Sequence, residues 1–289
     1  AITAWHGLLA QNNTGAWTVS GGTVSSSSPT QNATASVTTA GVVTTVSFSG
    51  FSTGTTNVAN ITGGTGSNLN SIAVFNSDGA GAVQGTPSLT FLYNWDTTPE
   101  SGAPAANDGG TAVMTITFSH PVTDPVLHLD RIGGFDSGRH NGMSFTLQNS
   151  DLSLTRLSGT DHFAVVGGSV IRNSQVGQTT SGTISGESGT NINNRTAAGS
   201  VLVNGTNITS ISFLMSFDVG SLEGLGGDEV ELKISLDPAP IARDDAFTMA
   251  EDATLSGNLF ANNGSGVDRD ENNDPLTITA VNGLAVTQG

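Results

Sequence analysis

Apolar residues and hydroxyl-bearing residues alternate along much of this chain, as in a β-strand with one buried and one exposed face. The clearest example runs from Ile208 to Phe217, where Ile211, Phe213 and Met215 also fall at every second position. Long runs of Leu, Ala, Glu and Lys at helical spacing are missing from the sequence. The pattern therefore predicts an all-β protein.

The same reading predicts a series of short strands separated by turns rich in Gly, Asn and Asp. They cover residues 41–48, 88–93, 111–118, 125–129, 143–147, 152–157, 201–203, 208–217 and 229–236. A long loop is expected at 94–110. Many short strands of this kind indicate a β-sandwich or jelly roll.

Two prolines mark a boundary near the C-terminal end of the sequence. Asp237-Pro238-Ala239-Pro240 follows a predicted strand, and proline cannot donate to a strand ladder and stiffens the backbone. We therefore expect a β-sandwich or jelly-roll domain at 1–237, a linker at 238–240 and a second unit at 241–289. A length of 289 residues suits two domains.

The first 77 residues contain no Asp, Glu, Lys or Arg. Exposed strand edges are normally protected by charges or proline, because an open edge pairs with other chains. Residues 1–77 therefore either form a head-to-tail contact with another copy of the protein or complete the central jelly roll of the same chain. Self-association into a homopolymer or surface array is the first interpretation, and both stay open at this level.

The chain as a whole is acidic, with 24 acidic and 8 basic residues and a formal net charge of −16. A field of this sign repels nucleic acid and anionic lipid, so we expect neither as a partner. It attracts cations, and carboxylates beside Asn are the oxygen-rich chemistry that Ca²⁺ prefers. The other interpretation is that acidity only keeps an exported protein soluble.

Cysteine is absent, which excludes disulfides, thiolate catalysis and Cys-bound zinc. No stretch approaches the roughly 18 consecutive apolar residues of a membrane span. The opening Ala1-Ile2-Thr3-Ala4 is typical of a mature end left after removal of a signal peptide. We therefore expect a secreted protein that is extracellular or at the cell surface.

Residues 242–283 carry several motifs in a recognisable order. They are Ala242-Arg243-Asp244-Asp245-Ala246-Phe247, Ala250-Glu251-Asp252, Leu255-Ser256-Gly257-Asn258-Leu259, Asp268-Arg269-Asp270 and Asp274-Pro275-Leu276-Thr277-Ile278. This order resembles the opening half of the cadherin-like, immunoglobulin-like tandem repeats of bacterial adhesins and other exported surface proteins. The resemblance implies a β-sandwich spacer, often with Ca²⁺ at its junctions, whose remaining strands come from further chain or from a neighbour.

Acidic residues of this unit are the predicted calcium ligands. Asp268, Asp270 and Asp274 offer convergent oxygens on one loop. Asp244 and Asp245 follow the linker, where a cation would stiffen the joint between domains. The motif that carries the resemblance adds Glu251, whereas Asn262-Asn263 replaces the family's usual Asn-Asp and weakens the case there.

A second group of acids lies in the central region. Asp130 and Asp136 flank the Gly133-Gly134 turn and are a further candidate cation site. Asp228, Glu229 and Glu231 either close a cation site from the last strand or form its solvent face.

The central region also resembles the non-repetitive, lectin-like domains that precede such repeats in fibrillar surface proteins. The resemblance rests on Phe118-Ser119-His120-Pro121-Val122 and on Val126-Leu127-His128-Leu129-Asp130-Arg131-Ile132-Gly133-Gly134. It implies a jelly roll with ligand contacts. The candidate ligand site is the loop with Trp95, Asp96, Glu100 and Asp108, since an aromatic ring beside carboxylates binds a sugar or a calcium ion. An ordinary solvated loop is the alternative.

Catalysis has little support in the sequence. His6, His120, His128, His140 and His162 follow no metal-binding spacing, and neither a Gly-x-Ser-x-Gly elbow nor a phosphate loop is present. His128 and Asp130 share a sheet face simply because strands alternate. We therefore expect a non-enzymatic, calcium-stabilised structural or adhesive surface protein that forms a fibre or biofilm matrix. A lectin-like module binding glycans or host surface proteins is the alternative, followed by a secreted hydrolase.

Overall fold

The computed structural model describes most of the central region and parts of both ends. The described residues are 2–4, 11–12, 15–20, 34–50, 57–68, 75, 87–94, 111–136, 139–174, 196–218, 228–238, 243–252, 254, 257–269, 276–278, 280–281 and 284–285. Every regular element in these ranges is a β-strand, and all strand pairs are antiparallel. The predicted all-β class is therefore confirmed.

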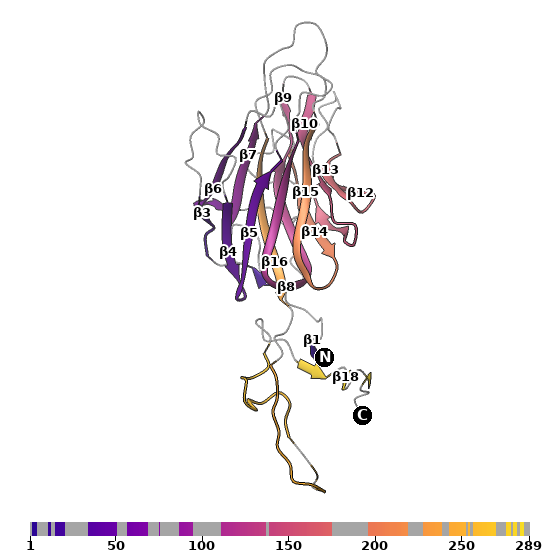
Figure 1. Cartoon of the computed structure of the whole chain (residues 1–289). Helices are drawn as coiled ribbons and strands as arrows, with labels where there is room; N and C mark the ends of the chain where they lie inside the picture. The colour runs from indigo at the N-terminus through magenta and orange to yellow at the C-terminus, as the bar shows by residue number, and fades with distance from the viewer. Residues whose placement is uncertain are drawn as a thin grey trace.

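One long strand, β8 (Thr111–Ile132), organises the domain because it joins the two layers of one 15-stranded sheet, called the first and the second sheet below (Figure 1). Its first half pairs with β5 (Val42–Ser49) and β15 (Ile208–Asp218). Its second half pairs with β14 (Ala197–Asn204) and β16 (Asp228–Pro238). The register with β15 shifts between the pairs Ser210↔Thr117 and Ile208↔Val122, which marks the bend between the halves.

Further strands extend both sheets outward. The first sheet adds β4 (Thr34–Thr39) and β3 (Thr18–Ser20) beyond β5, and β10 (Arg139–Leu147), β13 (Val170–Asn173) and β12 (Phe163–Val166) beyond β15. The second adds β7 (Pro87–Asn94) and β6 (Asn57–Asn68) beyond β16, and β11 (Ser153–Gly159) beyond β14. Two short strands, β2 (Gln11–Asn12) and β9 (Gly134–Asp136), pair with β16 and β10.

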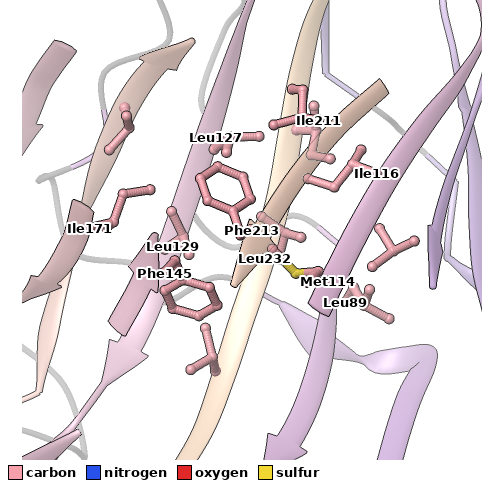
Figure 2. Close-up of a cluster of buried hydrophobic side chains, with 14 of the residues drawn as sticks. Leu89, Met114, Ile116, Leu127, Leu129, Phe145, Ile171, Ile211, Phe213 and Leu232 are labelled. Carbon is pink, nitrogen blue, oxygen red and sulfur yellow. The ribbon is translucent and has the colours of Figure 1, made fainter. Parts of the chain in front are cut away.

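Side chains from the two sheets meet in a hydrophobic core (Figure 2). Phe91 on β7 lies 5.3 Å from Phe48 on β5 and 6.2 Å from Phe145 on β10, measured between ring centroids. Phe145 in turn meets the ring of Phe213 edge-on at 6.4 Å. Because these rings come from opposite sheets, the domain is a β-sandwich, as predicted.

The uncharged strands β4 and β5 are interior strands of this sandwich. Ala35, Val37, Val42, Val46 and Phe48 are buried on one side of the hairpin. Val46 and Phe48 lie opposite Ile116 and Met114 of β8. Residues 34–50 therefore pack within their own chain, which is the intramolecular one of the two interpretations.

Two sequence-based boundaries differ from the structure. The strands predicted at 111–118 and 125–129 are one strand, because neighbours on both sides continue the ladder through the bend. β16 also runs through Pro238, which stands opposite Val122, so the last strand takes in the first residue of the predicted linker. The described residues include no helix long and apolar enough to cross a membrane.

The described C-terminal residues form turns, isolated bridges and short strands. Asp245 and Gly264 make one of the bridges. β17 (Leu276–Ile278) pairs with β1 (Ile2–Ala4), and β18 (Ala280–Val281) pairs with β19 (Leu284–Ala285). Met249, Leu259 and Val267 expose their apolar side chains.

Candidate functional site

A buried polar layer covers the outer face of the second sheet. On β8, Leu127 and Leu129 point into the core, so the alternating Val126, His128 and Asp130 point the other way. All of these side chains are nonetheless buried. Neighbouring strands add further buried polar residues to the same face, namely Ser88, Thr90, Ser200, Glu231, Lys233 and Ser235.

His128 lies at the centre of the polar layer. Its Nδ1 is 2.8 Å from the Ser200 hydroxyl on β14, and its Nε2 is 2.7 Å from the Ser235 hydroxyl on β16. Phe75 meets the imidazole edge-on at 6.2 Å between ring centroids. Burial, followed by the positive charge of Lys233, lowers the pKa of His128 from 6.5 to about 3. The imidazole is therefore neutral near pH 7, with one nitrogen donating and the other accepting.

Lys233 stands opposite His128 on β16 and is completely buried. Its Nζ donates a hydrogen bond to the carbonyl oxygen of Pro87, at the start of β7, over 3.2 Å. Burial lowers the pKa of Lys233 from 10.5 to about 8. The amine consequently ties two strands together while carrying a charge that the sheet must compensate.

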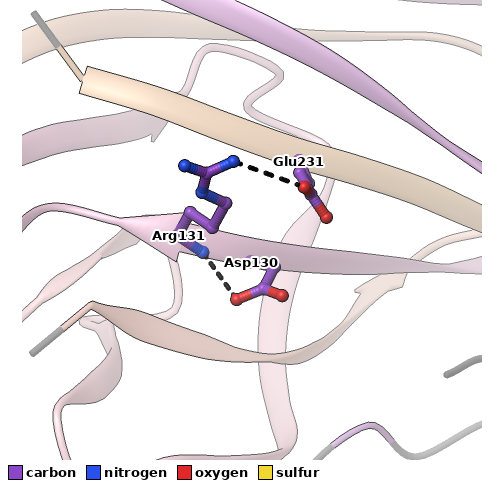
Figure 3. A network of polar contacts seen from close by, with 3 residues as sticks. All are labelled: Asp130, Arg131 and Glu231. Atoms are coloured by element: carbon purple, nitrogen blue, oxygen red, sulfur yellow. Dashed lines mark hydrogen bonds and ion pairs between the residues drawn. The ribbon is translucent and has the colours of Figure 1, made fainter. Parts of the chain in front are cut away.

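Acidic residues of this layer lie beside the His128–Lys233 pair, at the next pair of facing positions on the same side of β8 and β16 (Figure 3). Glu231 is opposite Asp130, and its Oε1 is 3.6 Å from Nη1 of Arg131. The backbone N–H of Arg131 donates to Oδ1 of Asp130 over 2.7 Å. Arg131 adopts a φ of 64°, a left-handed conformation that turns the chain at the end of β8.

The hydrogen bonds of the polar layer join neighbouring strands. Both ring nitrogens of His128 are occupied by hydroxyls, and those of Ser200 and Ser235 belong to fully buried residues. A general base needs a substrate proton within hydrogen-bond reach, and a nucleophile needs access to its target. Hydrogen bonds that link β8, β14, β16 and β7 instead satisfy polar groups whose burial would otherwise cost several kcal/mol.

The candidate cation sites of the central region look different in the structure. Asp130 is buried at a strand end and accepts a hydrogen bond from its neighbour. Glu231 is also buried, so the alternative that placed it on a solvent face is wrong. The side chains of Asp136, Asp228 and Glu229 lie outside the described residues.

Asp268 carries the most distinctive geometry of the C-terminal candidates. Its side chain is only 6% exposed, and its Oδ1 accepts a hydrogen bond from the backbone N–H of Arg243 at 2.5 Å. Its Oδ2 is buried and has no hydrogen-bond partner among the described residues. A buried carboxylate oxygen without a donor is costly unless a cation neutralises it, so Asp268 fits a calcium ligand.

The other C-terminal candidates are more open. Asp245 is half-buried and accepts a hydrogen bond from Asn263 Nδ2 over 2.8 Å, whereas Asp244 and Glu251 are exposed. In the part of the chain that the structure describes, no three His, Asp or Glu side chains form a group able to hold a metal ion. Asp270 and Asp274 lie outside the described residues, as do Trp95, Asp96, Glu100 and Asp108.

Sequence reasoning missed most of the polar layer. Lys233 and Ser235 alternate with apolar residues on β16, which is also the pattern of a strand with a solvated face. The available signal was the high apolar content around His128 in Val126-Leu127-His128-Leu129, since strands buried on both faces read as nearly continuous apolar runs.

Comparisons with known proteins add little to this geometry. No protein-family model and no curated protein match the chain. Among solved structures, the adhesin domain of PrgB from Enterococcus faecalis bound to DNA is similar at 9% identity, over 80% of this chain and 94% of that chain, with a TM-score of 0.30. So slight a likeness carries no argument, and neither sequence resemblance is confirmed. That this acidic chain binds no nucleic acid stays a prediction from its charge.

Proposed function

We propose that this chain is a non-enzymatic, extracellular surface protein with a structural and adhesive role, in which the sandwich serves as a stable body and calcium stiffens the C-terminal unit. Assembly with further copies into a fibre or matrix is part of the proposal. The chain's acidity argues against nucleic acid and anionic membranes as partners.

The burial of the polar layer is the observation that supports this proposal most directly. His128 and Lys233 carry the most reactive side chains of the polar layer. Both are fully buried and hydrogen-bonded to groups on neighbouring strands. Their chemistry is used to hold four strands together. Such a use suits a domain that must resist unfolding outside the cell without any disulfide.

Surface display tests the adhesive role. Cells that display residues 1–289 should be retained on mucin-coated glass under flow, or should aggregate with one another, roughly ten-fold more than cells carrying the display scaffold alone, because many weak contacts add through avidity. A matched control displays the Phe213→Ala chain, which tests whether the folded sandwich is needed. Retention and aggregation both equal to the scaffold alone would contradict the proposal.

Calcium is proposed for the C-terminal unit because of the buried Oδ2 of Asp268. Asp270 and Asp274, two and six residues further along the same predicted loop, would complete the ligand set. A divalent cation would supply the charge that neutralises these carboxylates, and it would stabilise the folded unit by mass action.

We expect chelator-treated protein to take up Ca²⁺ in calorimetric titration and to melt at a higher temperature afterwards. Binding only the folded state adds about 2.7 kcal/mol when the free ion is at 100 times its dissociation constant. Asp268→Asn should weaken binding roughly ten-fold or more, since it removes one ligand charge. Asp252→Asn is the control, because Asp252 is exposed and its φ of 64° suits Asn. Equal affinities for both variants and wild type would exclude Asp268 as a ligand.

A further inference from the structure

Strand β1 leaves the sandwich and pairs with the C-terminal unit. Ile2, Thr3 and Ala4 stand opposite Ile278, Thr277 and Leu276 in a separate two-stranded sheet. The next strand along the chain, β2, is held in the sandwich, where Gln11 and Asn12 pair with Leu236 and Ser235 of β16. Residues 5–10 therefore connect a strand in the sandwich to a strand outside it.

This small sheet depends on tethering rather than on its own contacts. Two strands of three residues are far below what an isolated sheet needs for stability in water. Both tethers start at the same end of β16, since β2 pairs near its C-terminal end and β16 itself leads on towards β17. Six residues between β1 and β2 span at most about 20 Å, and residues 239–275 join β16 to β17, so both strands stay attached near the same end of β16 and meet at a raised effective concentration.

Neither strand carries a charge that would oppose pairing with another copy. β1 lies in the charge-free segment, and Leu276, Thr277 and Ile278 are uncharged as well. Among the described residues, β1 and β17 each pair only with the other. Unpaired N–H and C=O groups on an edge without charges are open to intermolecular pairing, and the three-residue length of both strands limits that pairing to a few hydrogen bonds.

We propose that β1 is exchanged between copies, so that Ile2–Ala4 of one molecule pairs with Leu276–Ile278 of a second. The same three residue pairs form within and between molecules, so exchange costs no contact, and local concentration decides between them. The inference rests on the proposed function, because copies crowded on a surface reach the concentration at which exchange competes.

Mixed single-cysteine chains test the exchange. The protein has no cysteine, so Thr3→Cys and Thr277→Cys introduce unique thiols at directly opposite positions, within the Cα separation that a disulfide spans. A tagged Thr3→Cys chain is mixed with an untagged Thr277→Cys chain at about 1 mM, the effective concentration of a short linker, and then oxidised. The matched control replaces Thr277→Cys with Val43→Cys, an exposed position on β5.

We expect roughly ten-fold more disulfide-linked heterodimer from the opposite pair than from the control pair. Equal yields would overturn the exchange, whether the Thr3→Cys/Thr277→Cys double variant then closes within one chain or fails to close at all. The cell-display assay does not depend on these thiols. Failure of the exchange with retention intact would therefore leave the adhesive role standing.

Discussion

Replacing Phe213 with alanine should lower the free energy of unfolding by about 3–5 kcal/mol, the usual cost of removing a buried phenylalanine. Phe213 is fully buried on β15, and its ring meets that of Phe145 edge-on in the middle of the core. The ring of Phe91 on β7 meets that of Phe145 and continues this contact into the facing sheet. The cavity would therefore open between both sheets, where neither can close it alone.

Urea unfolding followed by tryptophan fluorescence measures this loss. Leu214→Ala is the matched control, because Leu214 is the next residue on the same strand and points to the outer, half-buried face. We expect its loss to be about 1 kcal/mol or less. Similar losses for the two variants would mean that β15 does not separate a core face from an outer face as described.

Acidification should destabilise the protein through His128. In the unfolded chain this histidine takes up a proton below its ordinary pKa of 6.5, but in the fold burial holds its pKa near 3. Between these values the unfolded state binds the extra proton, so stability falls as the pH falls, by about 1.4 kcal/mol per pH unit. The full loss near pH 3 is roughly 5 kcal/mol, and above pH 6.5 the group contributes no pH dependence.

Urea unfolding at pH 7 and pH 4.5 tests the effect with two variants. His128→Asn should remove most of the slope, whereas His120→Asn, at an exposed position on the same strand, should keep it. If His128→Asn fails to fold, proton NMR of the wild type still decides the matter. One of the five histidines should stay neutral down to pH 4.5, and protonation of all five above that pH would refute the burial of a neutral His128.

Lys233 changes stability in the same direction as His128, but at alkaline pH. Its folded pKa of about 8 lies below the ordinary 10.5, so the buried charge costs stability at neutral pH and is relieved as the pH rises through that window. The carboxylates of Asp130 and Glu231 face the same side of the sheet. Burial of the Lys233 amine therefore costs stability, which its hydrogen bond to the carbonyl of Pro87 on β7 partly offsets.

By itself, the sequence determined the all-β class, many of the longer strands and the inward face of β15. Alternation at Ile211, Phe213 and Met215 predicts which side is buried, because successive side chains of a strand point to opposite faces. The strand predicted at 88–93 falls inside β7, and that at 208–217 inside β15. Local periodicity was enough to predict these strands, because apolar side chains of each strand lie on the face that packs in the core.

Only the tertiary structure decided which strands pair with one another and which side chains are buried on the outer face of the second sheet. The bend in β8 depends on four partner strands, and β12 and β13 form a hairpin that the pattern did not predict. Lys233 and Glu231 look solvated in sequence, yet both are buried, and Phe75 packs against His128 on the same face. A polar side chain is buried by segments that are distant in the sequence, and the local periodicity of a strand does not reveal those segments.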